Sequence, residues 1–194
     1  MLSRFTKKLF SEFSLGIFFL EFISIILAIF LGYLATNWNE NRIEEKEARE
    51  ALELMCDELT QNYNTLQDYQ KYYHRMLFLV DSLDALGQFD TLFKMEEYHS
   101  INPPFVYTFA YKVAESSGKL GNIDHKKATL IYRNYLSLRG LEESIEMVQV
   151  QLLTGKLEGV DDWRMAFNFF REPIDLFFRD FPLLQQEGIC TSSK

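Results

Sequence analysis

The residues that could bind metal or carry out catalysis are few and scattered. Glu96 and His99 form a Glu-x-x-His pair, which puts a carboxylate and an imidazole on one helix face, as in half of a carboxylate-bridged di-metal site. The sequence has no second such pair, so we expect an exposed, solvated pair instead. His74 and His125 stand alone, and the three histidines share no metal-ligand spacing. We therefore expect no metal site and no cofactor.

A second candidate is the Ser116-Ser117-Gly118-Lys119 segment, which has a weak likeness to the end of a phosphate-binding loop. The residue five positions before Gly118 is Val113 rather than glycine, and no predicted strand precedes it. A helix C-terminus explains the segment more simply. Because a Gly-x-Ser-x-Gly elbow is also missing from the sequence, we expect no catalytic residue and no enzymatic activity.

Cys56 and Cys190 are the two cysteines, and their wide separation fits neither a zinc site nor a dithiol redox motif. Two alternatives stay open at this point. Both thiols are unpaired, or they form one disulfide in a domain that lies outside the cytoplasm. The net charge of -8 argues against nucleic-acid binding, which needs clustered Lys and Arg to neutralise phosphates.

The apolar stretch at residues 15–36 carries a single charged residue, Glu21. At about 1.5 Å per residue it is long enough to cross a hydrocarbon core of about 30 Å. We expect it to remain uncleaved, because Tyr33 occupies the -3 position of the one obvious signal-peptidase site, where a small residue is required. Residues 1–14 alternate Phe and Leu with basic residues, as an amphipathic tail at the membrane interface does.

Small residues recur every four positions along this span and predict a surface for packing against another helix. This predicted membrane-helix packing surface consists of Glu21, Ser24, Ala28, Gly32 and Thr36. One interpretation is that it drives self-association or docking to another membrane protein, with Glu21 as a polar contact. The alternative makes Glu21 the boundary of a shorter span from Phe22 to Trp38, with the small residues spaced by chance.

The exit from the span is marked by aromatic and polar residues that fit an interfacial collar. The collar consists of Tyr33, Asn37, Trp38, Asn39 and Glu40. Three basic residues precede the span and three follow it closely, so the positive-inside rule alone is nearly balanced. The short N-terminal tail favours an N-terminus in the cytoplasm and a large domain outside it.

The remainder, residues 37–194, predicts a soluble antiparallel helical bundle. A long helix from Ile43 has apolar residues in a seven-residue register, with Gly87 as its C-terminal cap and Asn62 as its polar interruption. The apolar stripe is wide, which favours a bundle over a two-stranded coiled coil. The register residues are Leu52, Leu59, Leu66, Tyr73 and Val80 in one row and Met55, Tyr69, Met76 and Leu83 in the next.

Three further segments complete the predicted bundle. Gln88–Ser100 holds a short helix, and a helix from Pro103 to Ser117 turns Val106, Phe109, Ala110 and Val113 inward before Gly118 ends it. Asp124 caps a longer helix that reaches about Thr154 and stops at Gly155. The Phe-rich stretch after Asp161 is interrupted by Pro173, which predicts two short helices that cover the end of the bundle. The fold class is all-α, because no segment alternates apolar and polar residues as strands do.

Two stretches, EFISIILAIFLGYLATNWNENR from Glu21 to Arg42 and ESSGKLGNIDHKKATLIYRNY from Glu115 to Tyr135, resemble a family of small bacterial single-span membrane proteins of unknown function. In that family a glutamate leads into an aliphatic span and an Asn-Trp-Asn-Glu collar follows it. The resemblance implies a bacterial inner-membrane protein with a helical domain, and it supplies no activity or catalytic residue. It favours Glu21 as a feature of the membrane boundary.

Together these patterns predict a membrane-anchored interaction protein that contacts the lipid bilayer and either itself or another membrane protein. Two alternatives remain. The helical domain binds a small ligand and signals through a partner, or Glu21 serves in an ion-conducting assembly.

Overall fold

The computed structural model describes residues 2–96, 98 and 103–190, with side chains from residue 17 onward. Its elements are α1 (Leu2–Ala85), η1 (Phe89–Lys94), α2 (Phe109–Ser116), η2 (Lys119–Asn122), α3 (His125–Leu153) and α4 (Val160–Gln186). These described residues contain no strand, which confirms the all-α class. The chain divides into two compact units, residues 1–46 and residues 47–194.

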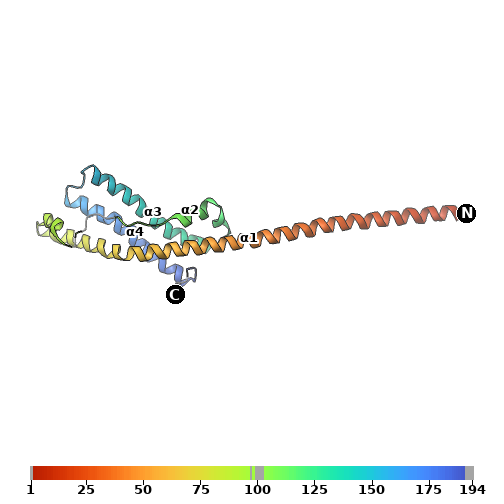
Figure 1. Ribbon diagram of the computed structural model, residues 1–194, viewed down its shortest axis with the longest axis horizontal. Coiled ribbons are helices and arrows are strands. Elements are labelled where there is room, and N and C mark those ends of the chain that lie inside the picture. Colours follow the sequence, from red (N-terminus) through yellow and green to blue (C-terminus); the bar gives the residue numbers. More distant parts are fainter. Residues whose placement is uncertain (1, 97, 99–102, 191–194) are drawn as a thin grey trace. The chain divides into compact units, whose positions relative to one another are not determined.

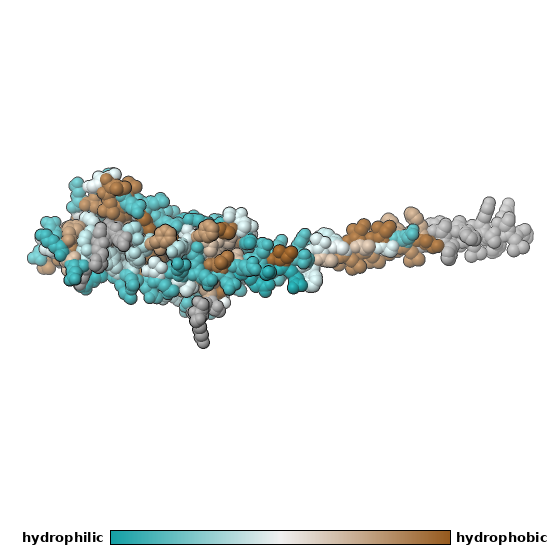
Figure 2. All heavy atoms as spheres, viewed as in Figure 1, coloured by the Kyte–Doolittle hydropathy of each residue, from teal (hydrophilic) through white to brown (hydrophobic). Residues whose placement is uncertain are grey.

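The first unit is helical and apolar. An 18-residue window in α1 reaches a mean hydropathy of 2.5, and none of that window is buried within the protein. Figure 2 shows apolar residues exposed along this part of α1. The helix is long and apolar enough to cross a membrane.

The second unit has one hydrophobic core, to which α1, α3 and α4 all contribute (Figure 1). The predicted register of α1 is confirmed at its centre, where Leu59, Leu66, Tyr73 and Val80 are fully buried. Tyr73 stacks on Phe170 of α4, with ring centroids 5.1 Å apart. Burial of large aromatic side chains from α4 therefore joins it to α1. The fully buried phenylalanines of α4 are Phe167, Phe170 and Phe177, with Phe181 nearly so.

The prediction of two short helices divided at Pro173 is wrong, because α4 is a single helix that contains both Pro173 and Pro182. A proline inside a helix costs about 3 kcal/mol, since it removes a backbone hydrogen bond and crowds the preceding turn. Phe170, Ile174 and Phe177 lie on either side of Pro173 in the sequence and are fully buried. Each contributes about 1.5–3 kcal/mol by burial, which offsets the proline.

The predicted helix from Pro103 is also wrong at its start, because residues 103–108 are irregular and α2 begins at Phe109. Its inward face differs accordingly. Val106 is buried as predicted, but Phe109 and Val113 are exposed, and Tyr111 and Ala114 are the buried residues of α2. The short helix predicted within Gln88–Ser100 is the 3-10 helix η1; residues 97, 99 and 100 lie outside the described residues.

Two predicted helix boundaries, at Gly87 and Asp124, are confirmed. Gly87 has a φ of +65°, and the backbone N–H of Gln88 donates to the carbonyl of Leu83 at 2.8 Å, which closes the C-terminus of α1. At the start of α3, the carboxylate of Asp124 accepts from the backbone N–H groups of Lys126 and Lys127.

Candidate interaction surface

The residues of the predicted membrane-helix packing surface all lie in α1 and are exposed. Two of their hydroxyls are satisfied by the helix itself. Ser24 Oγ donates to the carbonyl of Glu21 at 2.8 Å, and Thr36 Oγ1 donates to the carbonyl of Gly32 at 3.0 Å. These bonds satisfy the hydroxyl protons of Ser24 and Thr36, which lowers the cost of placing these two side chains in an apolar environment.

The collar residues Tyr33, Asn37, Trp38, Asn39 and Glu40 are likewise exposed in α1. The guanidinium of Arg42 lies 5.3 Å from the centre of the Trp38 ring, within range of a cation–π contact. Trp and Tyr are enriched at membrane–water interfaces, so exposed aromatic residues here are compatible with the predicted collar.

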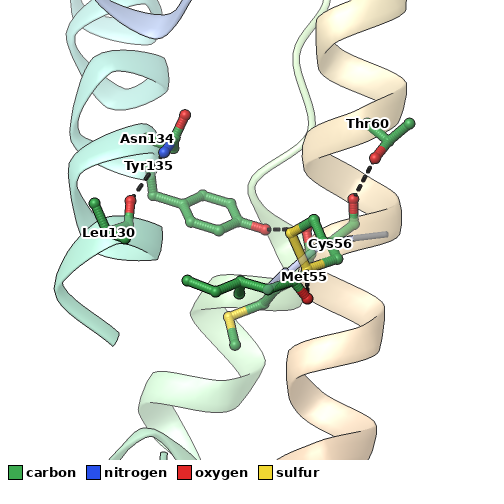
Figure 3. Close-up of a disulfide and its surroundings, with 8 residues drawn as sticks. Met55, Cys56, Thr60, Leu130, Asn134 and Tyr135 are labelled. Carbon is green, nitrogen blue, oxygen red and sulfur yellow. Dashed lines mark hydrogen bonds between the residues drawn. A yellow bond between two sulfur atoms is a disulfide. The ribbon is translucent and has the colours of Figure 1, made fainter. Parts of the chain in front are cut away.

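Cys56 and Cys190 form a disulfide, which resolves the two alternatives for the cysteines (Figure 3). Their Cα atoms are 5.2 Å apart, and the bond joins the residues after α4 to α1 across 134 positions of sequence. Both cysteines are buried, so the bond lies inside the second unit rather than at its surface.

A polar network lies beside the disulfide and joins three helices. Figure 3 shows the Tyr135 ring pointing from α3 toward the disulfide on α1. The Tyr135 hydroxyl donates to Glu58 Oε1 at 2.7 Å, while Glu58 Oε2 accepts from the backbone N–H of Ala110 in the first turn of α2 at 2.9 Å. Burial, and then the hydrogen bond to Glu58, raise the pKa of Tyr135, so its hydroxyl remains protonated. Glu58 therefore fixes the start of α2 against α1 and α3.

Asn62, the polar interruption in α1, binds the segment that precedes α2. Its side chain is fully buried. Asn62 Nδ2 donates to the Tyr107 carbonyl at 2.7 Å, and the Tyr107 N–H donates to Asn62 Oδ1 at 2.8 Å. The amide thus satisfies both backbone groups of Tyr107, as a neighbouring strand would.

A groove of about 400 Å³ lies between α1 and α2, and Glu58 is one of its lining residues. Its apolar residues include Leu54, Phe109 and Val113, whose exposed fractions are 62%, 75% and 43%. Carboxylates also line it, from Glu50, Asp57 and Glu58, together with Lys119. We call this feature the α1–α2 groove.

A different polar cluster holds α3 to α4. Asp180 is buried and accepts from Arg133 Nη2 at 3.0 Å and from Arg179 Nε at 2.8 Å. The hydrogen bond from Arg179, together with the positive charge of Arg133, lowers the pKa of Asp180 despite its burial. The cluster has the form of a structural ion pair between helices, because both arginines already bind the carboxylate.

Two of the residues first considered for chemistry, His74 and Ser117, make contacts of their own. His74 Nε2 lies 2.8 Å from Asp175 Oδ1, an exposed contact between α1 and α4. Ser117 Oγ donates to the Val113 carbonyl at 2.7 Å, in keeping with a helix C-terminus rather than a phosphate loop. His99 lies outside the described residues. Among the residues described, no three His, Cys, Asp or Glu side chains are placed to hold a metal ion.

Sequence reasoning missed the α1–α2 groove because it assigned Phe109 and Val113 to the core. One signal was visible: Leu54 lies outside both rows of the seven-residue register, so α1 has an apolar residue off its buried face. The roles of Glu58 and Asn62 depend on contacts 45 to 77 positions away, which local patterns do not reveal.

Comparison with known proteins finds no match for this chain among protein-family models, curated proteins or solved structures.

Proposed function

We propose that this protein is a membrane-anchored interaction protein, with residues 15–36 spanning a bacterial inner membrane and the second unit forming an antiparallel helical bundle that binds another protein. The observation that carries the proposal is apolar surface that the protein leaves uncovered in both units. The apolar window of α1 has no buried residue, and the α1–α2 groove exposes Leu54 and Phe109. Lipid covers the first surface and a protein partner covers the second.

The disulfide supports a location of the second unit outside the cytoplasm. Disulfides form and persist in the periplasm and other oxidising compartments, whereas cytosolic thiols are kept reduced. The Cys56–Cys190 bond therefore favours the same orientation as the short N-terminal tail does.

Within the membrane, the packing surface from Glu21 to Thr36 supports association with a second span. An added Cβ on Gly32 would meet no atom within 4 Å, so another helix backbone can approach there. The span and the groove are thus two separate contact surfaces. The resemblance to a family of bacterial membrane proteins agrees with this proposal, and membership of that family stays a prediction.

The test is affinity purification of the full-length tagged protein from native membranes after crosslinking, with identification of the crosslinked species. We expect a discrete complex, either with a second copy through the span or with another protein. A Gly32→Leu variant, which blocks close helix approach, is expected to lose complexes formed through the span. Monomer as the sole species, with and without crosslinker, would contradict the proposal.

A further inference from the structure

We propose that the α1–α2 groove binds an amphipathic helix of a partner protein that presents apolar side chains flanked by Lys or Arg. This inference rests on the proposed function and names the chemistry of its partner. Leu54, Phe109 and Val113 supply the apolar contact. Recognition of an apolar helix face by an apolar groove is a common mode of protein binding.

Charge selects a basic partner. Among the described residues that line the groove, the carboxylates are Glu50, Asp57 and Glu58 and the cation is Lys119, which lies 3.5 Å from Glu47 Oε2. Glu50 and Glu58 already have partners within the chain, so Asp57 is the carboxylate that we assign to a cation of the partner. The net charge of the second unit also favours a basic partner. Residues 47–194 contain 15 Lys and Arg against 23 Asp and Glu, so the entire net charge of -8 belongs to this unit. Opposite charge at the edge of a groove speeds association and rejects acidic partners.

The groove is built to hold its shape before a partner arrives. Glu58 binds the backbone N–H of Ala110, and Asn62 binds both backbone groups of Tyr107, so two residues that line the groove are fixed to α1. A preformed site loses little conformational entropy on binding.

The same charges disfavour two other occupants. A membrane surface rich in anionic lipid is repelled by the carboxylates. A second copy of the chain in a two-fold contact would bring the same acidic lining from both sides, so neither copy supplies the excess of cations that the groove favours. A basic protein segment avoids both penalties.

The test uses the full-length protein in phosphatidylcholine nanodiscs, with a photoreactive phenylalanine analogue in place of Phe109. The probe is a synthetic peptide of about 18 residues, long enough to form a helix, made of Leu, Ala and Lys with its leucines on one face. A second peptide has Glu in place of each Lys. Phe78 of α1 is a matched control position, since its exposed fraction of 62% is close to the 75% of Phe109 and it lies outside the groove.

We expect saturable crosslinking of the Lys peptide at position 109 and little at position 78. The Glu peptide is expected to crosslink roughly tenfold less, because the acidic lining attracts Lys side chains and repels Glu side chains. Asp57→Asn is expected to weaken the Lys peptide about threefold, whereas Asp68→Asn, a carboxylate outside the groove with a 93% exposed side chain, leaves it unchanged.

Three results would overturn the inference: equal crosslinking of both peptides, equal crosslinking at positions 78 and 109, or crosslinks between two copies of the chain at position 109. If the complexes that survive Gly32→Leu also persist in a Phe109→Asp variant, the groove is not the contact surface and the proposed function still stands. If no native complex forms at all, the proposed function itself fails.

Discussion

Asn62 is the polar residue within the apolar face of α1, and its side chain binds both backbone groups of Tyr107. Removing the amide breaks two hydrogen bonds to the backbone of Tyr107, each of which contributes about 0.5–1.5 kcal/mol, so the loss is about 1–3 kcal/mol. We predict that Asn62→Ala lowers the free energy of unfolding by that amount. The measurement is urea unfolding followed by the fluorescence of Trp163, which lies in the core, in a Trp38→Phe background.

The matched control is Asn64→Ala, because Asn64 is an exposed amide two positions further along the same helix. It is expected to change stability by less than about 0.5 kcal/mol. Equal effects of the two substitutions would show that the Asn62 contact does not hold residues 103–108 in place.

Asp180 gives the stability of the second unit a defined dependence on pH. Its pKa in the folded protein is below the ordinary value of 3.8, chiefly because Arg179 hydrogen bonds to its charged form. The folded state thus binds fewer protons at this site than the unfolded state, so the stabilisation is present above pH 3.8 and is lost as pH falls through the folded pKa. We predict that the urea midpoint falls on acidification below about pH 4, and that Asp180→Asn reduces this fall.

At neutral pH, Asp180→Asn should also cost about 2 kcal/mol, since hydrogen bonds to charged groups contribute about 1.5–3 kcal/mol. Asp68→Asn provides the control carboxylate, which is exposed. If the urea midpoint of Asp180→Asn falls with acidification as steeply as that of the wild type, groups other than Asp180 cause the fall.

At the scale of the elements, the sequence predicts helix boundaries that depend on residues within one or two turns. Asp124 caps α3 and Gly87 ends α1 as predicted, because each acts on backbone groups next to it. The start of α2 was not readable. Pro103 is a favourable first residue of a helix, yet contacts from Asn62 and Glu58 hold the chain irregular until Phe109.

The wrong prediction of two helices divided at Pro173 has a related cause. Pro173 disfavours a helix interior locally, and only the burial of Phe170 and Phe177 against α1 and α3 outweighs it. The burial of these residues is a property of the assembled core. The α1–α2 groove could not be predicted from local patterns either, because the exposure of Phe109 depends on where α2 begins.

Two glycines are expected to respond in opposite directions to alanine. Gly140 lies inside α3, where an added Cβ would meet Pro173 at 3.9 Å, an ordinary contact. We predict that Gly140→Ala stabilises the second unit by about 1 kcal/mol, because alanine has the higher helix propensity. The change in urea midpoint measures the effect, and a loss of stability would indicate that α3 and α4 lie closer together than described.

Gly87 has a φ of +65°, a conformation that side chains with a Cβ rarely adopt. Gly87→Ala is therefore predicted to lower stability by about 1 kcal/mol, measured in the same way. An unchanged midpoint would mean that the end of α1 tolerates another backbone conformation.

For the molecule as a whole, the disulfide closes most of the second unit into one loop of 134 positions. Closing a loop of this length reduces the entropy of the unfolded chain and stabilises a fold by about 2–5 kcal/mol. We predict a loss in that range for the Cys56→Ser, Cys190→Ser double variant. Reduced wild-type protein should unfold at the same urea concentration as the variant. If both unfold at the urea concentration of the oxidised wild type, the disulfide does not stabilise the fold.

We propose that an N-terminal span anchors the disulfide-closed second unit on the oxidising side of a bacterial inner membrane. The most direct test is a gel-shift measurement with maleimide-linked polyethylene glycol on acid-quenched cells that express the native chain, performed on the carbonate-washed membrane fraction. We predict that the protein stays in this fraction and that Cys56 and Cys190 react only after reduction. Release of the protein into the carbonate supernatant would contradict the membrane anchor. Cysteines that react without a reductant would contradict the disulfide and the oxidising location.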